Sequence, residues 1–331
     1  MLIHICMALN KGYVKPTTVA MYSICANAKE GVQLKFWLLN NDLGDTEREF
    51  VRAKLDIFKD KYTVEYLDIP REYYDRLPCV DKFGKETWYR VLIPLLMPQL
   101  DKVLYLDGDI IVLDDLSELY NTNIESSAYA ACSEKKPLVW QCNPIVHTRQ
   151  HFKFRFFDKI GLDILDEDTQ YVNAGVMLIN CEYWRKHNYL GQILEFADRY
   201  KDDTDYKYPD QDAINCVANN DTTSNIKYVS LKYNFPPNIL QYKRYNPIVL
   251  QTYLKMLGVE HEAHEGWQPA IFHFAGVKPW KGAKYQENTI YRDYASKIGW
   301  KIPRRQLNVK LALKNTFKFW VPNGLLKKLT K

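Results

Sequence analysis

Two aspartates beside an apolar stretch are the residues of this sequence whose types and spacing suggest chemistry. In KVLYLDGDIIVLDDL, residues 102–116, Asp107 and Asp109 flank Gly108 between two strand-like runs. Residues two apart on an extended chain point the same way, so the carboxylates converge, and Gly108 leaves room for a ligand to approach. Carboxylates at close range repel each other unless a cation lies between them. The pattern predicts a divalent-metal site, and the alternative is a solvated turn, where aspartate and glycine are common.

A second segment, HFAGVKPW at residues 273–280, combines an imidazole, a glycine and a lysine. His273 can supply a nitrogen ligand to the same cation, which favours manganese over magnesium. Gly276 lets the backbone approach a ligand, and Lys278 offers a positive charge suited to a phosphate. Because a histidine in an apolar run is more often a hydrogen-bonded core residue, this segment gains weight only in combination with the aspartates.

Amide and acid groups beside small or turn residues are further candidates for ligand binding. Asn173, in YVNAGVMLIN, can donate to hydroxyls or cap a turn. In YPDQD, Asp210 is equally suited to be a helix N-cap or a ligand contact. Gln211 and Asp212 are candidates to face a sugar.

Strands that alternate with helices must position these groups. The expected strands lie at 2–8, 32–40, 62–69, 102–107 and 171–180, and the expected helices at 16–28, 45–58 (capped by Asp45), 87–97 (kinked or ended by Pro94), 181–201 and 210–220. This alternation predicts a mainly parallel α/β sheet. Ligands of such sheets bind at the carboxyl ends of strands, where both aspartates stand. Residues 133–165 and 221–270 are less regular, and we expect them to select a second substrate.

The composition points to a globular protein. Of 331 residues, 47% are hydrophobic and 26% are charged, which excludes disordered and fibrous classes. No apolar run reaches the ~18 residues that a membrane-spanning helix needs. Seven cysteines without a CxxC pair fit a reducing compartment, so we expect a cytoplasmic protein.

The positive charge of the chain is concentrated at its end. Residues 301–331 hold nine Lys or Arg and no acid, so a formal charge of +5 for the whole chain becomes −4 for residues 1–300. Lys310, Lys314 and Lys318 are four apart beside apolar residues, which predicts a basic amphipathic tail on the anionic inner face of the cell membrane. The alternative is a solvated end. The acidic body argues against nucleic acid as a partner.

The segments LYLDGD, YVNAGVMLIN, DQDAIN and HFAGVKPW, with TWYRVLIP, resemble glycosyltransferase family 8 over residues 1–282. This family comprises retaining enzymes such as glycogenin and the bacterial lipopolysaccharide galactosyl- and glucosyltransferases, and the resemblance is greatest to the lipopolysaccharide type. It implies a GT-A type nucleotide-diphospho-sugar transferase fold in one catalytic domain. The nucleotide-sugar half would cover about 1–130 and the acceptor half about 131–300, followed by the tail at 301–331.

Carried over residue by residue, the resemblance implies manganese, or alternatively magnesium, held by Asp107, Asp109 and His273. Donor contacts would come from Ala8, Asn10, Arg90, Gly108, Asn173, Asp210, Gln211, Gly276 and Lys278. The sequence departs from the family in two places. The first loop reads ALNKGY where the family commonly has an acidic pair and Asn-Tyr, and Gly276 and Lys278 are one residue closer than in several members.

The implied activity is transfer of a hexose, glucose or galactose, from a UDP-sugar with retained configuration. The acceptor would be a glycan or glycolipid such as the lipopolysaccharide core. A double displacement needs a carboxylate behind the anomeric carbon, and the matching residue is Gln211, whose neutral amide is a poor nucleophile. We therefore favour front-side attack, with Asp210 or Asp212 as nucleophile as the alternative.

Two other classes remain open at this point. A phosphohydrolase of the haloacid dehalogenase type also places a DxD pair after a strand and uses magnesium. That class expects the motif on the first strand followed by Thr or Val, whereas Ile111 stands there, after about a hundred residues of α/β pattern. The third class is a non-catalytic nucleotide-sugar binder, which would bind UDP with metal and without turnover.

Overall fold

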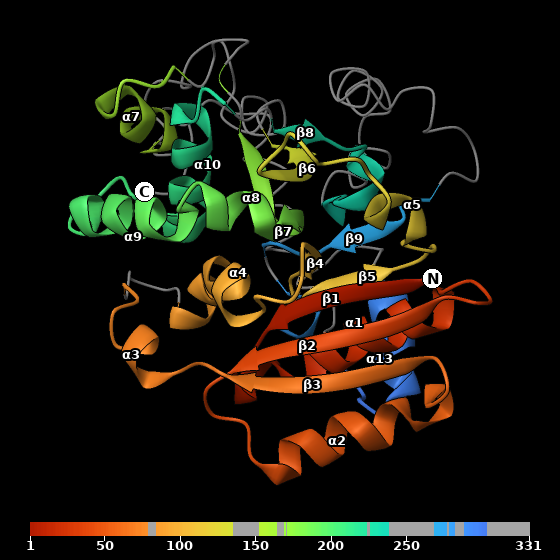
Figure 1. The fold of residues 1–331 in the computed structure, drawn as a ribbon. Coiled ribbons are helices and arrows are strands. Elements are labelled where there is room, and N and C mark those ends of the chain that lie inside the picture. The colour runs from red at the N-terminus through yellow and green to blue at the C-terminus, as the bar shows by residue number, and fades with distance from the viewer. Residues whose placement is uncertain are drawn as a thin grey trace, which may run out of the picture.

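A twisted sheet forms the centre of the molecule (Figure 1). The structure, a computed structural model, describes residues 1–78, 84–134, 152–163, 169, 171–223, 226–237, 268–276, 278–281 and 288–302. Within these residues, seven strands pair in the order β3-β2-β1-β4-β7-β6-β8. Their bounds are β1 (Leu2–Ala8), β2 (Gln33–Asn40), β3 (Tyr62–Asp68), β4 (Lys102–Leu106), β6 (Tyr129–Ser133), β7 (Val172–Asn180) and β8 (Lys227–Tyr228).

The first four of these strands along the chain are parallel, as the sequence pattern predicts. β1 pairs in parallel with β2 and β4, and β2 pairs in parallel with β3. β7 runs antiparallel to both β4 and β6, whereas β8 is parallel to β6. The expectation of a mainly parallel sheet flanked by helices is therefore confirmed, and the antiparallel strand lies next to β4, where the aspartates follow.

Both faces of the sheet carry a hydrophobic core, because successive strand residues point to opposite sides. In β1, Ile3, Ile5 and Met7 pack in one core with residues of α1, α2 and α13, whereas Cys6 packs in the other with residues of α8, α9 and α10. The helices have these bounds: α1 (Val14–Asn27), α2 (Asp45–Leu55), α3 (Arg71–Tyr74), α4 (Ile93–Leu96), α5 (Ser117–Tyr120), α7 (Phe152–Lys159), α8 (Cys181–Lys186), α9 (Tyr189–Tyr200), α10 (Pro209–Asn220) and α13 (Asn288–Lys297).

Shorter 3-10 segments complete the described elements: η1 (Lys11–Tyr13), η2 (Asp56–Phe58), η3 (Lys85–Leu92), η5 (Leu231–Tyr233) and η7 (Pro279–Lys281). The expected helix over residues 87–97 is wrong in type, since most of it is the 3-10 helix η3, followed by the short α4. Pro94 has no N–H for a bond to Arg90, and its ring would clash with that carbonyl in an α-helix. In the first turn of α4 the missing donor costs nothing.

Two further expectations about helices are corrected. Residues 181–201 form two helices, because Asn188 adopts a left-handed backbone conformation (φ 49°) between α8 and α9. α2 is capped by Gly44 and not by Asp45: the Glu47 carboxylate accepts a hydrogen bond from the Gly44 N–H at 2.9 Å. Asp45 is instead the first residue of the helix, where a negative charge favours the helix dipole.

A small two-stranded sheet brings two segments that are distant in the sequence together beside β4. β5 (Ile110–Val112) pairs antiparallel with β9 (Ile271–His273), and Ile110 lies opposite His273. The apolar run after Asp109 therefore leaves the main sheet and pairs with the segment that contains the histidine. This pairing carries the HFAGVKPW segment to the carboxyl end of β4.

Several expectations fall outside the described residues. The basic tail lies almost wholly in residues 303–331. Most of the two irregular segments, 133–165 and 221–270, lies in residues 135–151 and 238–267. Membrane attachment through the tail and acceptor selection by those segments therefore remain predictions from the sequence. In the described part of the chain, the structure contains no helix that is long and apolar enough to cross a bilayer. The cysteines of that part, Cys6, Cys25, Cys132, Cys181 and Cys216, are buried and free.

Candidate active site

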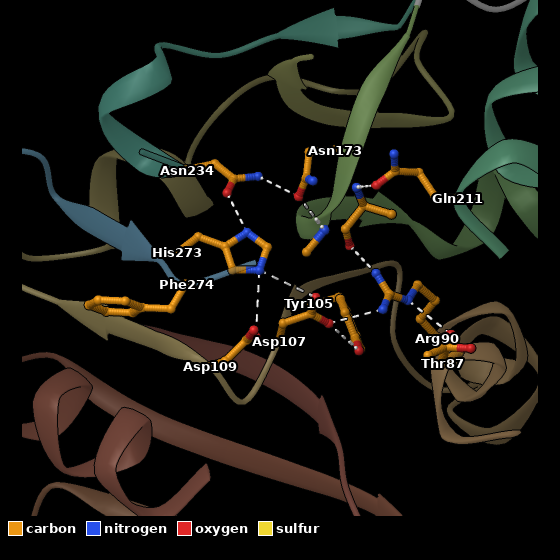
Figure 2. Close-up of polar contacts among 12 residues, drawn as sticks. Thr87, Arg90, Tyr105, Asp107, Asp109, Asn173, Gln211, Asn234, His273 and Phe274 are labelled. Carbon is orange, nitrogen blue, oxygen red and sulfur yellow. Dashed lines mark hydrogen bonds and ion pairs between the residues drawn. The ribbon is translucent and has the colours of Figure 1, made fainter. Parts of the chain in front are cut away.

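Asp107 follows directly after β4 and is fixed by its neighbours. Its N–H donates to the Gly175 carbonyl of β7 at 2.8 Å, which continues the antiparallel ladder one residue beyond the strand. Its Oδ1 accepts hydrogen bonds from Arg90 Nη2 at 3.0 Å and from the Tyr105 hydroxyl at 2.9 Å. These two donors hold the carboxylate so that Oδ2 faces the imidazole of His273 (Figure 2).

Asp107, Asp109 and His273 form one cluster. His273 Nε2 lies 3.6 Å from Asp107 Oδ2 and 3.5 Å from Asp109 Oδ1. Both distances exceed a normal hydrogen bond, but two ligands of one cation, each about 2.1 Å from it, can be that far apart. One ligand atom from each side chain lies within 4.8 Å of the others. Two hard oxygens and an imidazole nitrogen are a donor set suited to manganese, so the residues present fit a divalent cation.

A lysine balances the buried acid of this cluster. Asp109 is 4% exposed, and its Oδ2 forms an ion pair with Lys278 Nζ, which also donates to the Phe274 carbonyl at 3.0 Å. Burial acts to raise the pKa of Asp109, but His273 and Lys278 outweigh it and hold that pKa well below the usual range. Asp109 is therefore an anion at neutral pH, as a metal ligand must be.

Two glycines allow this close packing. A Cβ atom on Gly175 would lie 2.3 Å from His273 Cε1 and 2.8 Å from Asp107 Oδ2. A Cβ atom on Gly108 would lie 2.5 Å from Thr17 Oγ1 in α1. Gly108 thus leaves room for Thr17 of α1, which approaches its backbone closely. Gly175, which the sequence does not single out, leaves the space that the side chains of His273 and Asp107 occupy.

Arg90 in η3 forms ion pairs with both Asp107 and Asp210. It is 5% exposed, and its Nε lies 3.0 Å from the Thr87 carbonyl and 3.1 Å from Asp210 Oδ2. Its Nη1 donates to the Ala174 carbonyl. Burial raises the pKa of Asp210 against the opposing charge of Arg90. Asp210 is the second residue of α10 and the helix is capped at Tyr208, so Asp210 is an ion-pair partner of Arg90 and not the N-cap.

Gln211 has a fixed orientation at the start of α10. Its Oε1 accepts from the Ala174 N–H at 3.1 Å, and its Nε2 donates to Glu134 Oε2 and to the Tyr171 hydroxyl, both at 2.8 Å. Because a backbone N–H can only donate, the oxygen of this amide must face β7. The Tyr171 hydroxyl in turn donates to Asp212 Oδ1 at 2.7 Å.

A cavity of about 440 Å³ lies over these groups. Its walls come from the loop after β1, η3, the turn between β4 and β5, β7, the start of α10 and the segment after β9. Asp107, Asp109, His273, Gln211 and Lys278 are among the residues that line it. Acids, amides and two cations thus converge at the carboxyl ends of parallel strands, where α/β sheets bind ligands.

The sequence matches the family model described as glycosyl transferase family 8 over residues 4–284, most of the chain. The chain belongs to glycosyl transferase family 8. It is therefore a transferase of sugars, and the phosphohydrolase alternative loses its support. The resemblance of the LYLDGD and HFAGVKPW segments to this family is confirmed.

Curated relatives in this family cover nearly the whole chain. General stress protein A of Bacillus subtilis is 23% identical over 309 residues, which cover 90% of this chain and 95% of the relative. The lipopolysaccharide 1,2-glucosyltransferase of Escherichia coli is 23% identical over 308 residues, which cover 90% of this chain and 79% of the relative.

Solved structures share the fold. A structure titled as the galactosyltransferase LgtC in complex with donor and acceptor sugar analogues aligns with a TM-score of 0.67 at 23% identity. The alignment covers 92% of this chain and 98% of that one. The protein thus has the GT-A type fold of this glycosyl transferase family.

Most of the residues predicted from the sequence line the cavity of this family 8 protein. They are Ala8, Asn10, Arg90, Asp107, Gly108, Asp109, Asn173, Asp210, Gln211, His273, Gly276 and Lys278. Asp212 is not among the lining residues: it is 1% exposed, and its carboxylate accepts from Tyr171 and from the Tyr208 N–H at 3.2 Å. It points away because neighbouring residues of a helix face different sides.

The sequence does not single out Asn234, Glu134 and Tyr171. Asn234 and Glu134 line the cavity, and Tyr171 hydrogen-bonds Gln211 beneath it. Asn234 stands in KYNFPPN, where asparagine beside proline indicates only a turn, and Glu134 follows β6 without a motif. The sequence pattern predicts no strand at residues 129–133, so the position of Glu134 at the end of β6 is a finding of the structure.

Proposed function

We propose that this glycosyl transferase transfers a hexose, glucose or galactose, from a UDP-hexose to a glycan or glycolipid acceptor. The reaction depends on manganese and retains the anomeric configuration. The lipopolysaccharide core is the acceptor class that we favour, because a relative over most of the chain is named a lipopolysaccharide 1,2-glucosyltransferase. We also propose that residues 1–300 act as one catalytic domain, with the donor half before about residue 130.

The observation that supports this proposal best is the convergence of Asp107, Asp109 and His273. Asp107 and Asp109 lie just before β5, and His273 is the last residue of β9, which pairs with β5. Their ligand atoms lie within 4.8 Å of one another. A divalent cation held there would offset the negative charge that develops on the diphosphate leaving group. Asp107 and Asp109 would hold it through oxygen and His273 through Nε2.

The other residues orient the donor. Lys278 lies beside Asp109 and can turn its ammonium group to a phosphate oxygen, which favours departure of the diphosphate. Asn173 accepts two hydrogen bonds through Oδ1, so its Nδ2 is the group that can donate to a sugar hydroxyl. Arg90 forms ion pairs with Asp107 and Asp210 and holds η3, β7 and α10 together around the cavity.

Front-side attack agrees with the place of Gln211. In this step the bond from the anomeric carbon to the diphosphate oxygen breaks, the acceptor oxygen bonds to the same face, and the acceptor proton passes to the departing phosphate. Gln211 is a neutral amide whose position is fixed by Ala174, Glu134 and Tyr171, which suits a residue that orients the sugar. Asp212 does not line the cavity, and Asp210 is paired with Arg90.

The test is turnover of UDP-glucose and UDP-galactose by the purified chain. We expect manganese-dependent release of UDP from one of them, and a chelator should abolish it. Asp109→Asn should lower the rate by at least tenfold because a charged metal ligand is lost. Asp114→Asn removes an exposed aspartate outside the cavity and should have no effect.

Three results would contradict the proposal. Release of phosphate from small phosphoesters without release of UDP would favour a hydrolase. Metal-dependent binding of UDP without turnover of any UDP-sugar would favour a binding protein. A product of inverted configuration, detected by NMR of the anomeric proton, would exclude the retaining mechanism.

A further inference from the structure

A chain of hydrogen bonds runs behind the imidazole of His273, on the side away from Asp107 and Asp109 (Figure 2). Asn173 Oδ1 lies 3.0 Å from the Gly175 nitrogen and 3.0 Å from Asn234 Nδ2. Asn234 Oδ1 lies 2.7 Å from His273 Nδ1. The chain begins at a backbone amide of β7 and ends at the ring nitrogen that does not face the acids.

The first donor of this chain fixes the direction of every bond. The Gly175 N–H can only donate, so the atom of Asn173 that it reaches must be the oxygen. That oxygen can only accept, so the atom of Asn234 beside it must be the nitrogen. The oxygen of Asn234 therefore faces the ring.

This direction decides the tautomer of the histidine. An amide oxygen can only accept, so His273 Nδ1 must carry a proton. In a neutral imidazole the other nitrogen is then an acceptor. His273 Nε2, which faces Asp107 and Asp109, presents a lone pair.

The fold places Asn234 independently of any ligand. η5 ends at Tyr233, and the next two residues follow the edge of β9: the Phe235 N–H donates to the Ile271 carbonyl at 2.9 Å, and the His273 N–H donates to the Phe235 carbonyl at 3.0 Å. Asn234 is 5% exposed. Its side chain is thus held beside His273 by the backbone of both segments.

We propose that Asn234 is a positioning residue that holds His273 in the Nδ1–H tautomer, so that Nε2 is a ready ligand for the cation. Without this bond the ring can place its proton on Nε2, where the two acids attract it, and that proton must leave before a metal binds. Groups that hold a ligating histidine in this way commonly change metal affinity by about 10–100-fold. The inference rests on the proposed function in one respect, namely that the cluster binds a cation.

The tautomer can be measured in the metal-free protein. With the whole chain labelled with ¹⁵N at histidine, two-bond ¹H–¹⁵N correlation NMR distinguishes the two neutral forms, and the ring of His273 is assigned from its absence in His273→Gln. The buffer should be about two pH units above the ordinary imidazole pKa of about 6.5. We expect the proton of the His273 ring on Nδ1. A proton on Nε2 would overturn the proposal, and this measurement needs no change at Asn234.

Variants of Asn234 test the consequence for metal binding. Asn234→Leu keeps the branching at Cγ without an acceptor, and we expect the Nε2–H form to appear and the calorimetric Mn²⁺ affinity to fall by about 10–100-fold. Asn234→Asp keeps an oxygen acceptor and should retain the Nδ1–H form. Asn123→Leu, at an exposed turn, is the control and should change neither quantity.

The outcomes separate this inference from the proposed function. If Asn234→Leu folds, as shown by its thermal melt, and keeps both the tautomer and the Mn²⁺ affinity, the inference is wrong. If the wild-type ring carries its proton on Nδ1 but Mn²⁺ does not bind, the positioning by Asn234 is supported and the proposed metal site fails. If Mn²⁺ binds and no UDP-sugar turns over, the inference stands and the proposed reaction does not.

Discussion

Each of the three aspartates that line the cavity is paired with a cationic side chain. Arg90 pairs with both Asp107 and Asp210, and Lys278 pairs with Asp109. Three carboxylates and two cations leave these side chains with one net negative charge, which attracts a divalent cation. With a divalent cation bound, the cation and these side chains together would be net positive, which would favour a diphosphate. The proposed metal and the proposed anionic donor could therefore bind in sequence.

The arrangement of Asp107 and His273 also depends on Gly175, because there is no room for a side chain at this position. Gly175→Ala would place a Cβ atom 2.3 Å from His273 Cε1, so the imidazole must move away from the acids. We expect the calorimetric Mn²⁺ affinity to fall at least tenfold and the free energy of unfolding to fall by about 1–3 kcal/mol, as is typical of overpacking. Gly276→Ala is the matched control, because a Cβ atom there meets nothing within 4 Å among the described residues. Equal Mn²⁺ affinity in the two variants would contradict this account of Gly175.

At the scale of elements, Asp221 connects the helices that cover the second face of the sheet. It follows α10, and its Oδ2 accepts from the hydroxyls of Tyr183 in α8 at 2.9 Å and Tyr189 in α9 at 2.8 Å. Thr223 donates to its Oδ1 from the backbone N–H at 2.9 Å and from the hydroxyl at 2.6 Å. The carboxylate thus holds the end of α10, whose start carries Gln211, against the other two helices.

These contacts give stability a dependence on pH. Burial acts to raise the pKa of Asp221, but the hydrogen bonds from Thr223, Tyr189 and Tyr183 outweigh it and lower the pKa from 3.8 to about 2. Because the folded pKa lies below the unfolded one, the stabilisation is present above about pH 4 and is lost as the pH falls through about 2.

Replacement of Asp221 measures this contribution. Asp221→Asn should lower the free energy of unfolding at neutral pH by about 1 kcal/mol, a value that allows for partial exposure. The difference from the wild type should shrink as urea unfolding is repeated at lower pH, towards pH 2. Asp202→Asn, an exposed aspartate nearby, should show no such trend. A difference that stays constant with pH would disprove the role of the charge.

At the scale of the whole molecule, the cavity joins segments that are far apart in the sequence. Its lining residues run from Ala8, the last residue of β1, to Lys278, and they come from both sides of β4. In Figure 1, β1–β3 lie on one side of β4, and β6–β8 lie on the other. A ligand that contacts both sides adds contacts between two parts of the sheet that are joined through the pairing of β4 with β1 and with β7.

Binding of the metal and the nucleotide should therefore stabilise the entire fold. At about 100 times the dissociation constant, a ligand adds about 2.7 kcal/mol to the free energy of unfolding. For a chain of this size we expect UDP with Mn²⁺ to raise the melting temperature by roughly 4 °C. Mn²⁺ or UDP alone should raise it less. Asp109→Asn should lose the combined shift, whereas Asp114→Asn should keep it; a full shift with UDP and a chelator would contradict a shared site.

The sequence by itself determined the elements whose signals are local. β1 and β4 are short apolar runs that are mostly buried, and helical segments separate the strands along the chain, so the parallel strands and their helices follow from neighbouring residues. The types and spacing of Asp107 and Asp109 predicted that their carboxylates converge, because side chains two apart on an extended chain share one side. The place of His273 beside them was an expectation from the resemblance to the family.

Tertiary structure decided which of these groups actually meet. His273 reaches the aspartates only because β9 pairs with β5, and Asn234 reaches His273 only because Phe235 pairs with Phe272. The rotation of α10 selects Gln211 over Asp212 for the cavity. Contacts between segments that are distant in the sequence depend on the register of strands and the packing of helix faces, which neighbouring residues do not specify.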